Sequence, residues 1–118
     1  MAGRLLILAL AFLTVNGKNT CEHLKLSGMS LYFNGIYGNR NTPHGQMPTY
    51  AHIDVKDTFL YYSVDESKWM IDDDFVDSHV FAHSATTSTS NPVLSNSWTA
   101  AVATWKNQPD ARFKCLDS

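Results

Sequence analysis

The chain contains two cysteines, Cys21 and Cys115, and they lie close to the two ends of the sequence that remains after a predicted leader. In an oxidising compartment, an even pair of cysteines most simply forms one disulfide. Such a bridge would make the first and last elements of the fold neighbours, and it could stabilise the fold by up to about 4–5 kcal/mol. Two free thiols or an intermolecular bridge are the alternatives.

The N-terminus predicts export to such a compartment. One basic residue precedes an unbroken apolar run over 5–13, and small or β-branched residues follow at the positions that a signal peptidase reads. A membrane anchor is the alternative, but a bilayer core needs about 20 apolar residues. We therefore predict a secretory signal peptide over 1–17 and a single secreted domain over 18–118, with no membrane span.

Length and composition disfavour several classes of protein. A chain of 118 residues is one small domain, since domains cluster at roughly 100–150 residues. The isoelectric point is about 6.2, and no cluster of Lys and Arg provides the electrostatic footprint of a nucleic-acid binder. A multidomain enzyme, a nucleic-acid-binding protein and a disordered acidic tail are therefore not expected.

The pattern of the mature chain predicts an all-β, mainly antiparallel fold, either a small sandwich or a meander. The clearest part is an alternating run over 49–55 and an aromatic, β-branched run over 59–64. A polar connection over 65–68 then leads into a strand that opens at Trp69. These signals predict three consecutive antiparallel strands.

Weaker signals extend this pattern toward both ends. Residues 22–26 alternate, and the Asn34–Gly35 pair is typical of a two-residue hairpin turn. Residues 79–83 and 113–116 predict further strands, with Cys115 on the last one. Residues 84–97 are rich in Ser and Thr and include an Asn-Pro pair, which predicts a long surface loop.

The segment 98–105 permits two interpretations. Trp98, Ala101, Val102 and Trp105 would share one face of a helix, so the pattern allows one short helix near residues 97–105. Trp, Thr and Val favour strands, however, and the surrounding pattern is β. We favour a strand here.

An acidic cluster, Asp72, Asp73 and Asp74 with Asp77, is the candidate metal site. Carboxylates at short spacing can bind Ca²⁺, which takes about six to eight oxygen ligands. The EF-hand pattern is missing, and the alternative is a solvated turn after a buried strand. No other cofactor is expected.

Signals for catalysis are weak. His79 and His83 lie four residues apart, but the sequence offers no obvious third ligand for zinc. The chain has no nucleophile elbow and no metalloprotease motif. Glu22 and Glu66 are not persuasive acids for glycoside hydrolysis. We therefore predict a protein that is not an enzyme, with a small secreted hydrolase as one alternative.

Aromatic residues raise the possibility of carbohydrate recognition. Phe59 and Tyr61 share one face of a predicted strand, and Leu60 and Tyr62 share the other. Such a strand is either covered on both faces or exposes one aromatic face, and exposed aromatic rings can stack on sugars. A lectin-like carbohydrate-binding module is therefore a second alternative, although core packing is the commoner role.

Several motifs occur in an order that resembles a module of extracellular proteins. They are Leu26-Ser27-Gly28, Asn34-Gly35-Ile36-Tyr37, Pro48-Thr49-Tyr50-Ala51-His52, Leu60-Tyr61-Tyr62 and Trp69-Met70-Ile71, followed by Pro92 and Trp98. The order is similar to the pattern SG…NGxY…PxYxH…LYY…WxI, which occurs singly or in tandem in invertebrate and microbial proteins, and it covers residues 24–105. The resemblance implies a β-rich binding or matrix domain without catalytic residues. The Asp72–Asp74 run departs from the pattern.

Together these signals predict a secreted, non-catalytic extracellular binding or structural protein, such as a component of an extracellular or mineralised matrix. The expected partner is an extracellular protein or a glycan, and the expected state is a monomer. In this interpretation the sheet is built by Tyr37, Tyr50, Tyr61, Tyr62 and Trp69. The acidic loop and the Ser/Thr-rich loop would face outward.

Overall fold

The structure is a computed structural model that describes residues 21–30, 32–76, 80–102 and 104–116. The predicted signal peptide, Asp77 and His79 lie outside the described residues. Within these ranges, no helix has the length and hydropathy needed to cross a membrane.

Nine strands form one curled sheet in which every pairing is antiparallel. The strands are β1 (His23–Ser27), β2 (Gly35–Asn39), β3 (Tyr50–His52), β4 (Phe59–Ser63), β5 (Lys68–Asp72), β6 (Ala82–His83), β7 (Trp98–Val102), β8 (Thr104–Gln108) and β9 (Arg112–Cys115). A single 3-10 turn, η2 (Pro92–Leu94), is the helical element among the described residues. The predicted all-β antiparallel fold is confirmed, and its form is a meander rather than a sandwich of two sheets.

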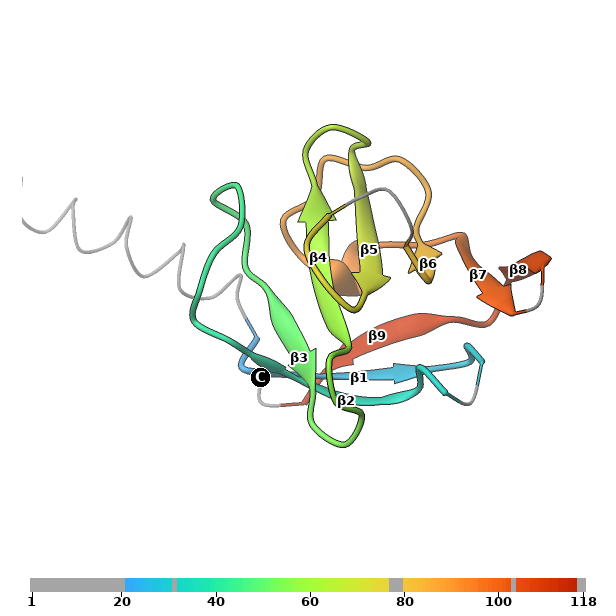
Figure 1. Cartoon of the computed structure of the whole chain (residues 1–118), viewed down its shortest axis with the longest axis horizontal. Coiled ribbons are helices and arrows are strands. Elements are labelled where there is room, and N and C mark those ends of the chain that lie inside the picture. The colour runs from blue at the N-terminus through green and yellow to red at the C-terminus, as the bar shows by residue number, and fades with distance from the viewer. Residues whose placement is uncertain (1–20, 31, 77–79, 103, 117–118) are drawn as a thin grey trace, which may run out of the picture.

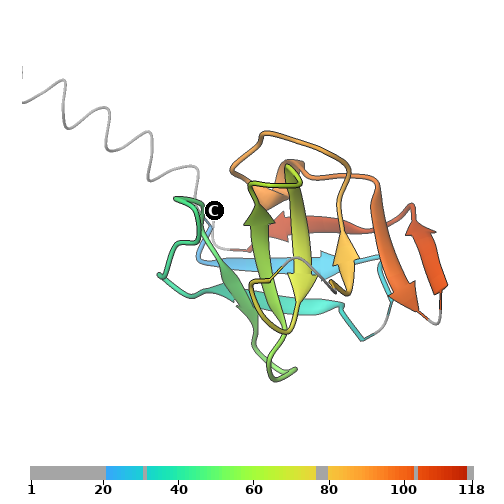
Figure 2. The ribbon, with the colours of Figure 1, turned by 45° about the horizontal axis from the view of Figure 1, so that its top comes forward.

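The curl of the sheet follows from its strand order, β8-β7-β6-β5-β4-β3-β2-β1-β9. β8 and β9 lie at opposite ends of this order, yet only residues 109–111 connect them. In a flat sheet they would be roughly 38 Å apart at about 4.8 Å per strand, whereas so short a connection spans about 14 Å. The sheet therefore bends until its ends approach each other (Figures 1 and 2).

The disulfide holds this arrangement at β9. Cys21 and Cys115 are bonded, with their Cα atoms 5.8 Å apart and a sequence separation of 94. β9 pairs with β1, so that Cys115 lies opposite Leu24. The prediction that the bridge makes the first and last elements neighbours is confirmed.

Alternation along the strands places one set of side chains in the core. The buried residues on the inner face include Leu24, Leu26, Tyr37, Tyr50, Leu60, Tyr62, Trp69, Ile71, Ala82, Trp98, Ala100 and Phe113. Trp98 of β7 packs against Phe113 of β9, with ring centroids 5.6 Å apart, and so joins the two ends of the curled sheet. Of the five aromatic residues expected to build the sheet, Tyr61 is also buried, but it lies on the outer face.

Residues 98–102 and 104–105 belong to two strands, so the favoured strand character is confirmed and the helical alternative is wrong. Trp98 is buried in the core, whereas Trp105 is half exposed and pairs with Ala101 across the β7–β8 hairpin. Trp98 and Trp105, which a helix would place on one face, therefore lie on opposite faces of the sheet. Pairing of β7 with β6, where Ala82 lies opposite Ala100, decides in favour of the strand.

The predicted two-residue turn at Asn34–Gly35 is wrong. Gly35 is the first residue of β2, and the connection from β1 runs from Gly28 to Asn34. The Asn34 side chain accepts a hydrogen bond from the Met29 N–H and donates one to the Met29 carbonyl, each at 3.0 Å. Asn34 thus closes a longer connection, because its amide can replace missing backbone partners.

The Ser/Thr-rich loop over 84–97 exposes Thr86, Ser88, Ser90, Leu94, Asn96 and Ser97, but it is also anchored to the core. The Trp69 indole N–H donates to the Thr89 carbonyl at 3.0 Å, and the Tyr62 hydroxyl donates to the Thr87 carbonyl. Ser84 is fully buried. Buried indole and phenol groups need hydrogen-bond partners, and the loop backbone supplies them.

Candidate functional site

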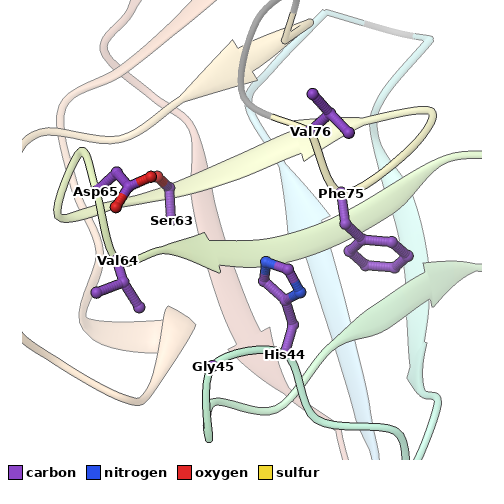
Figure 3. A pocket seen from close by; sticks show the side chains of 7 residues that line it. All are labelled: His44, Gly45, Ser63, Val64, Asp65, Phe75 and Val76. Atoms are coloured by element: carbon purple, nitrogen blue, oxygen red, sulfur yellow. The ribbon is translucent and has the colours of Figure 1, made fainter.

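Three connections meet on the outer face of β4 and line an open hollow of about 510 Å³. The connections are the one between β2 and β3, the turn between β4 and β5, and the segment after β5. The lining residues, shown in Figure 3, are His44, Gly45, Ser63, Val64, Asp65, Phe75 and Val76. We call this feature the outer hollow.

A tight turn positions His44 at the outer hollow. The backbones of His44 and Met47 exchange hydrogen bonds of 2.9 and 3.1 Å, and Gly45 and Gln46 between them have φ of 58° and 67°. Two consecutive positive φ values are typical of a type I′ turn. The turn lays the imidazole against Tyr61 and Phe75, with each pair of ring centroids 5.5 Å apart.

Phe75 forms the second aromatic wall. Its ring lies 5.0 Å from the Phe59 ring and 5.3 Å from the Tyr61 ring, so it covers the outer face of β4. The Arg40 guanidinium lies over Phe75 at 4.7 Å and donates to the Thr49 hydroxyl at 3.0 Å. β4 is therefore covered on both faces, and the uncovered apolar surface lies beside it rather than on it.

The remaining lining combines apolar and polar groups. Val64 and Val76 are 61% and 60% exposed, which is unusually open for valine in a small domain. Asp65 is exposed in the β4–β5 turn, and the Ser63 hydroxyl accepts the Glu66 N–H at 3.1 Å. Aromatic walls with a carboxylate at the rim can hold a ligand that has an apolar face and polar edges.

The predicted acidic site is partly assembled. Carboxylate oxygens of Asp72, Asp73 and Asp74 lie within 4.8 Å of one another. Asp72 is 1% exposed, while the other two are exposed. The Asp72 carboxylate accepts the Asp73 N–H at 2.8 Å, and the Asp74 carboxylate accepts the Val76 N–H at 2.9 Å. These bonds shape the segment that carries Phe75 and Val76 into the outer hollow.

Burial dominates the electrostatics of this acidic cluster. Burial first, and then the negative charges of Asp74 and Asp73, raise the pKa of Asp72 to about 7, although the bond from the Asp73 N–H lowers it. A carboxyl that is partly protonated near neutral pH is a weaker cation ligand than an ionised one. Calcium binding here stays a prediction.

The histidines have different roles. The Nδ1 atom of His52 accepts the N–H groups of Asp54 and Val55 at 3.1 and 3.2 Å, so its Nε2 carries the proton and donates to the Asn34 carbonyl at 2.9 Å. Both ring nitrogens of His52 therefore serve the fold. His83 contacts Trp105, with ring centroids 5.2 Å apart.

Residues that carry the sequence resemblance hold the fold rather than line the outer hollow. Gly28 has φ of 78°, and a Cβ there would lie 1.9 Å from the Asp110 carbonyl oxygen, so only glycine fits. The Tyr37 hydroxyl donates to the Phe33 carbonyl at 2.7 Å, and burial raises the pKa of Tyr37. The ordered motifs thus mark structural positions.

In the sequence, Ser63, Val64 and Asp65 are recognisable only as strand or connection residues, and no motif marks His44 or Phe75 as a site residue. His44 lies in a polar connection, and Phe75 follows the acidic run. One signal for the site in the sequence is the isolated Phe75–Val76 pair in a polar loop.

No family model matches the chain, and neither a curated protein nor a solved structure matches it significantly.

Proposed function

We propose that the protein is a secreted, non-catalytic extracellular binding protein, and that its ligand binds in the outer hollow. The observation that carries the proposal is the hollow itself, which three connections build around His44, Phe75 and two exposed valines. Exposed apolar side chains beside a polar rim are typical of interaction sites.

The disulfide supports the extracellular part of the proposal. A Cys21–Cys115 bond persists in oxidising environments and is rare in the cytosol. The bond is therefore compatible with a secreted protein. The apolar leader predicted over 1–17 supports the same location.

The contacts that the histidines His44 and His52 make support a non-catalytic role. His52 directs both ring nitrogens at backbone groups, and His44 packs as an aromatic wall. General base catalysis needs a ring nitrogen placed toward a substrate proton. A structural role in an extracellular or mineralised matrix is one form of this proposed function.

A glycan is the alternative ligand class that the outer hollow itself favours. The rings of His44 and Phe75 line the hollow, and the Asp65 carboxylate at the rim could accept hydroxyl hydrogen bonds. Sugars present an apolar face and a ring of hydroxyls, which match this combination. Tyr32 and Trp105, which are 58% and 52% exposed, lie outside the hollow, where they contact Phe33 and His83 respectively.

Binding of the secreted, oxidised protein to a glycan array and to a panel of purified extracellular matrix proteins tests the proposal. Val64→Lys places a charge at the mouth of the outer hollow and should weaken binding roughly tenfold or more. Ile53→Lys is the matched control, because Ile53 is 57% exposed but does not line the hollow. Both substitutions should change stability by less than about 0.5 kcal/mol.

The proposal fails if both variants bind every captured ligand as well as the natural protein does. It also fails if the protein hydrolyses a glycan or peptide that it binds, since the small-hydrolase alternative would then hold.

A further inference from the structure

A row of cations lies on the outer face of β1 and β9. Lys25, Arg112 and Lys114 are exposed and alternate with the buried residues Leu26 and Phe113. All three cations therefore point away from the core on the same face. We call them the basic stripe.

The register of the sheet brings two of these cations directly together. Lys25 lies opposite Lys114, and Arg112 lies opposite Ser27. On its other side Lys25 lies opposite Ile36 of β2. Like charges directly opposite each other across a strand pair are destabilising. The Lys25–Lys114 pair therefore lowers the stability of the fold at this position.

Acidic groups near the basic stripe lie at its ends. Asp110 precedes β9, and its backbone carbonyl accepts the Arg112 Nε–H at 3.3 Å. Glu22 precedes β1. The described side-chain hydrogen bond of a stripe cation, that of Arg112, goes to a backbone carbonyl and not to a carboxylate. Most of the other described acidic residues lie on the connections around β3, β4 and β5.

We propose that the basic stripe binds a sulfated polysaccharide. Arg112 and Lys114 are two residues apart along β9, hence separated by about 6.6 Å, and Lys25 lies beside Lys114 on β1. A linear chain bearing repeated sulfates can place its anions along this row. The formal net charge is −2, so attraction of a polyanion depends on this local arrangement and not on the charge of the whole molecule.

Neighbouring residues favour a polysaccharide over other polyanions. Single-stranded nucleic acids are held by exposed aromatic rings beside the cations, but the aromatic residue of β9, Phe113, is buried. Leu116, which follows β9 two residues after Lys114, is 45% exposed, but one apolar side chain buries little area in a membrane. The proposal does not depend on the outer hollow.

Retention on immobilised dextran sulfate, with unsulfated dextran as the control matrix, tests the proposal on the secreted, oxidised protein. The natural protein should bind dextran sulfate at low ionic strength and be released as salt screens the contacts. Lys114→Glu should weaken binding roughly tenfold or more, since it removes one cation and places an anion beside Lys25.

Thermal stability separates this loss from misfolding. Lys114→Glu replaces a repulsive cross-strand pair with an attractive one, so its melting temperature should equal or exceed that of the natural protein. Lys68→Glu on β5 is the matched control with the same change of charge, and it should keep binding within about twofold. Val64→Lys in the outer hollow should also bind dextran sulfate within about twofold of the natural protein.

Three results would overturn the proposal. The natural protein could fail to bind dextran sulfate at low salt, or the two Glu variants could lose binding equally, which would assign the effect to net charge. Stronger binding to single-stranded DNA or to vesicles of anionic lipid than to dextran sulfate would assign the stripe to a different polyanion.

Discussion

Asp72 shows how burial changes the chemistry of a residue whose sequence context suggests a solvated turn. It ends β5 on the outer face, opposite Phe59, and is 1% exposed, whereas Asp73 and Asp74 are exposed. Three consecutive aspartates predict an acidic cluster, but they do not reveal which carboxylate the Phe75 segment encloses. That difference raises the pKa of one member of the run to about 7.

The raised pKa predicts a pH-dependent stability. Because the folded protein binds this proton more tightly than the unfolded chain, the contribution is fully present below pH 3.8 and is lost as the pH rises through about 7. Asp72→Asn removes the ionisation and keeps an oxygen for the Asp73 N–H. Relative to the natural protein, its free energy of unfolding should rise by on the order of 2–4 kcal/mol between acidic and mildly alkaline pH.

Urea unfolding of both proteins across this pH range measures the effect. Asp73→Asn, which alters an exposed carboxylate, should show a much smaller dependence. A constant difference between Asp72→Asn and the natural protein at every pH would contradict the assignment.

The loop over 84–97 shows the limits of prediction for an element. Its Ser, Thr and Pro content correctly indicates an irregular segment, which contains only η2. Composition cannot indicate that Tyr62 and Trp69, distant in sequence, donate hydrogen bonds to its carbonyls. The β7–β8 hairpin illustrates the converse case, because residue preference and strand pairing agree and the strand prediction holds.

Tyr62→Phe tests the anchoring of this loop. The substitution preserves the buried ring but leaves the Thr87 carbonyl without its phenol donor, which should lower the free energy of unfolding by about 1–2 kcal/mol. Hydrogen exchange should quicken at the Thr87 amide, which donates to the Ser67 carbonyl. Tyr32→Phe, at a 58% exposed position, is the control and should be nearly neutral. Equal effects of the two substitutions would show that the anchor contributes nothing.

At the scale of the molecule, the curled sheet and the disulfide both hold the two ends of the described fold beside each other. The chain brings β9 beside β1, so the bridge spans 94 residues of sequence but only 5.8 Å between Cα atoms. A cross-link of this length restricts the unfolded chain much more than the folded one. The curl also places the outer hollow and the basic stripe on different parts of the outer face.

Cys21→Ala combined with Cys115→Ala should lower the free energy of unfolding by up to about 4–5 kcal/mol, mainly by raising the entropy of the unfolded chain. Urea denaturation of the double variant and of the natural protein, with and without reductant, measures the loss. Reductant should affect only the natural protein. An unchanged midpoint in the double variant would contradict a stabilising role for the bridge.

The sequence by itself determined the strand-rich pattern, the central three-stranded meander and the cysteine pairing, because alternation, residue preference and an even cysteine count are local or countable properties. Only the tertiary structure decided that the sheet curls, that the Ser/Thr-rich loop is anchored, and that His44 meets Phe75 over β4. It also placed Lys25 opposite Lys114. These features depend on register and on contacts between residues distant in sequence, which local patterns do not encode.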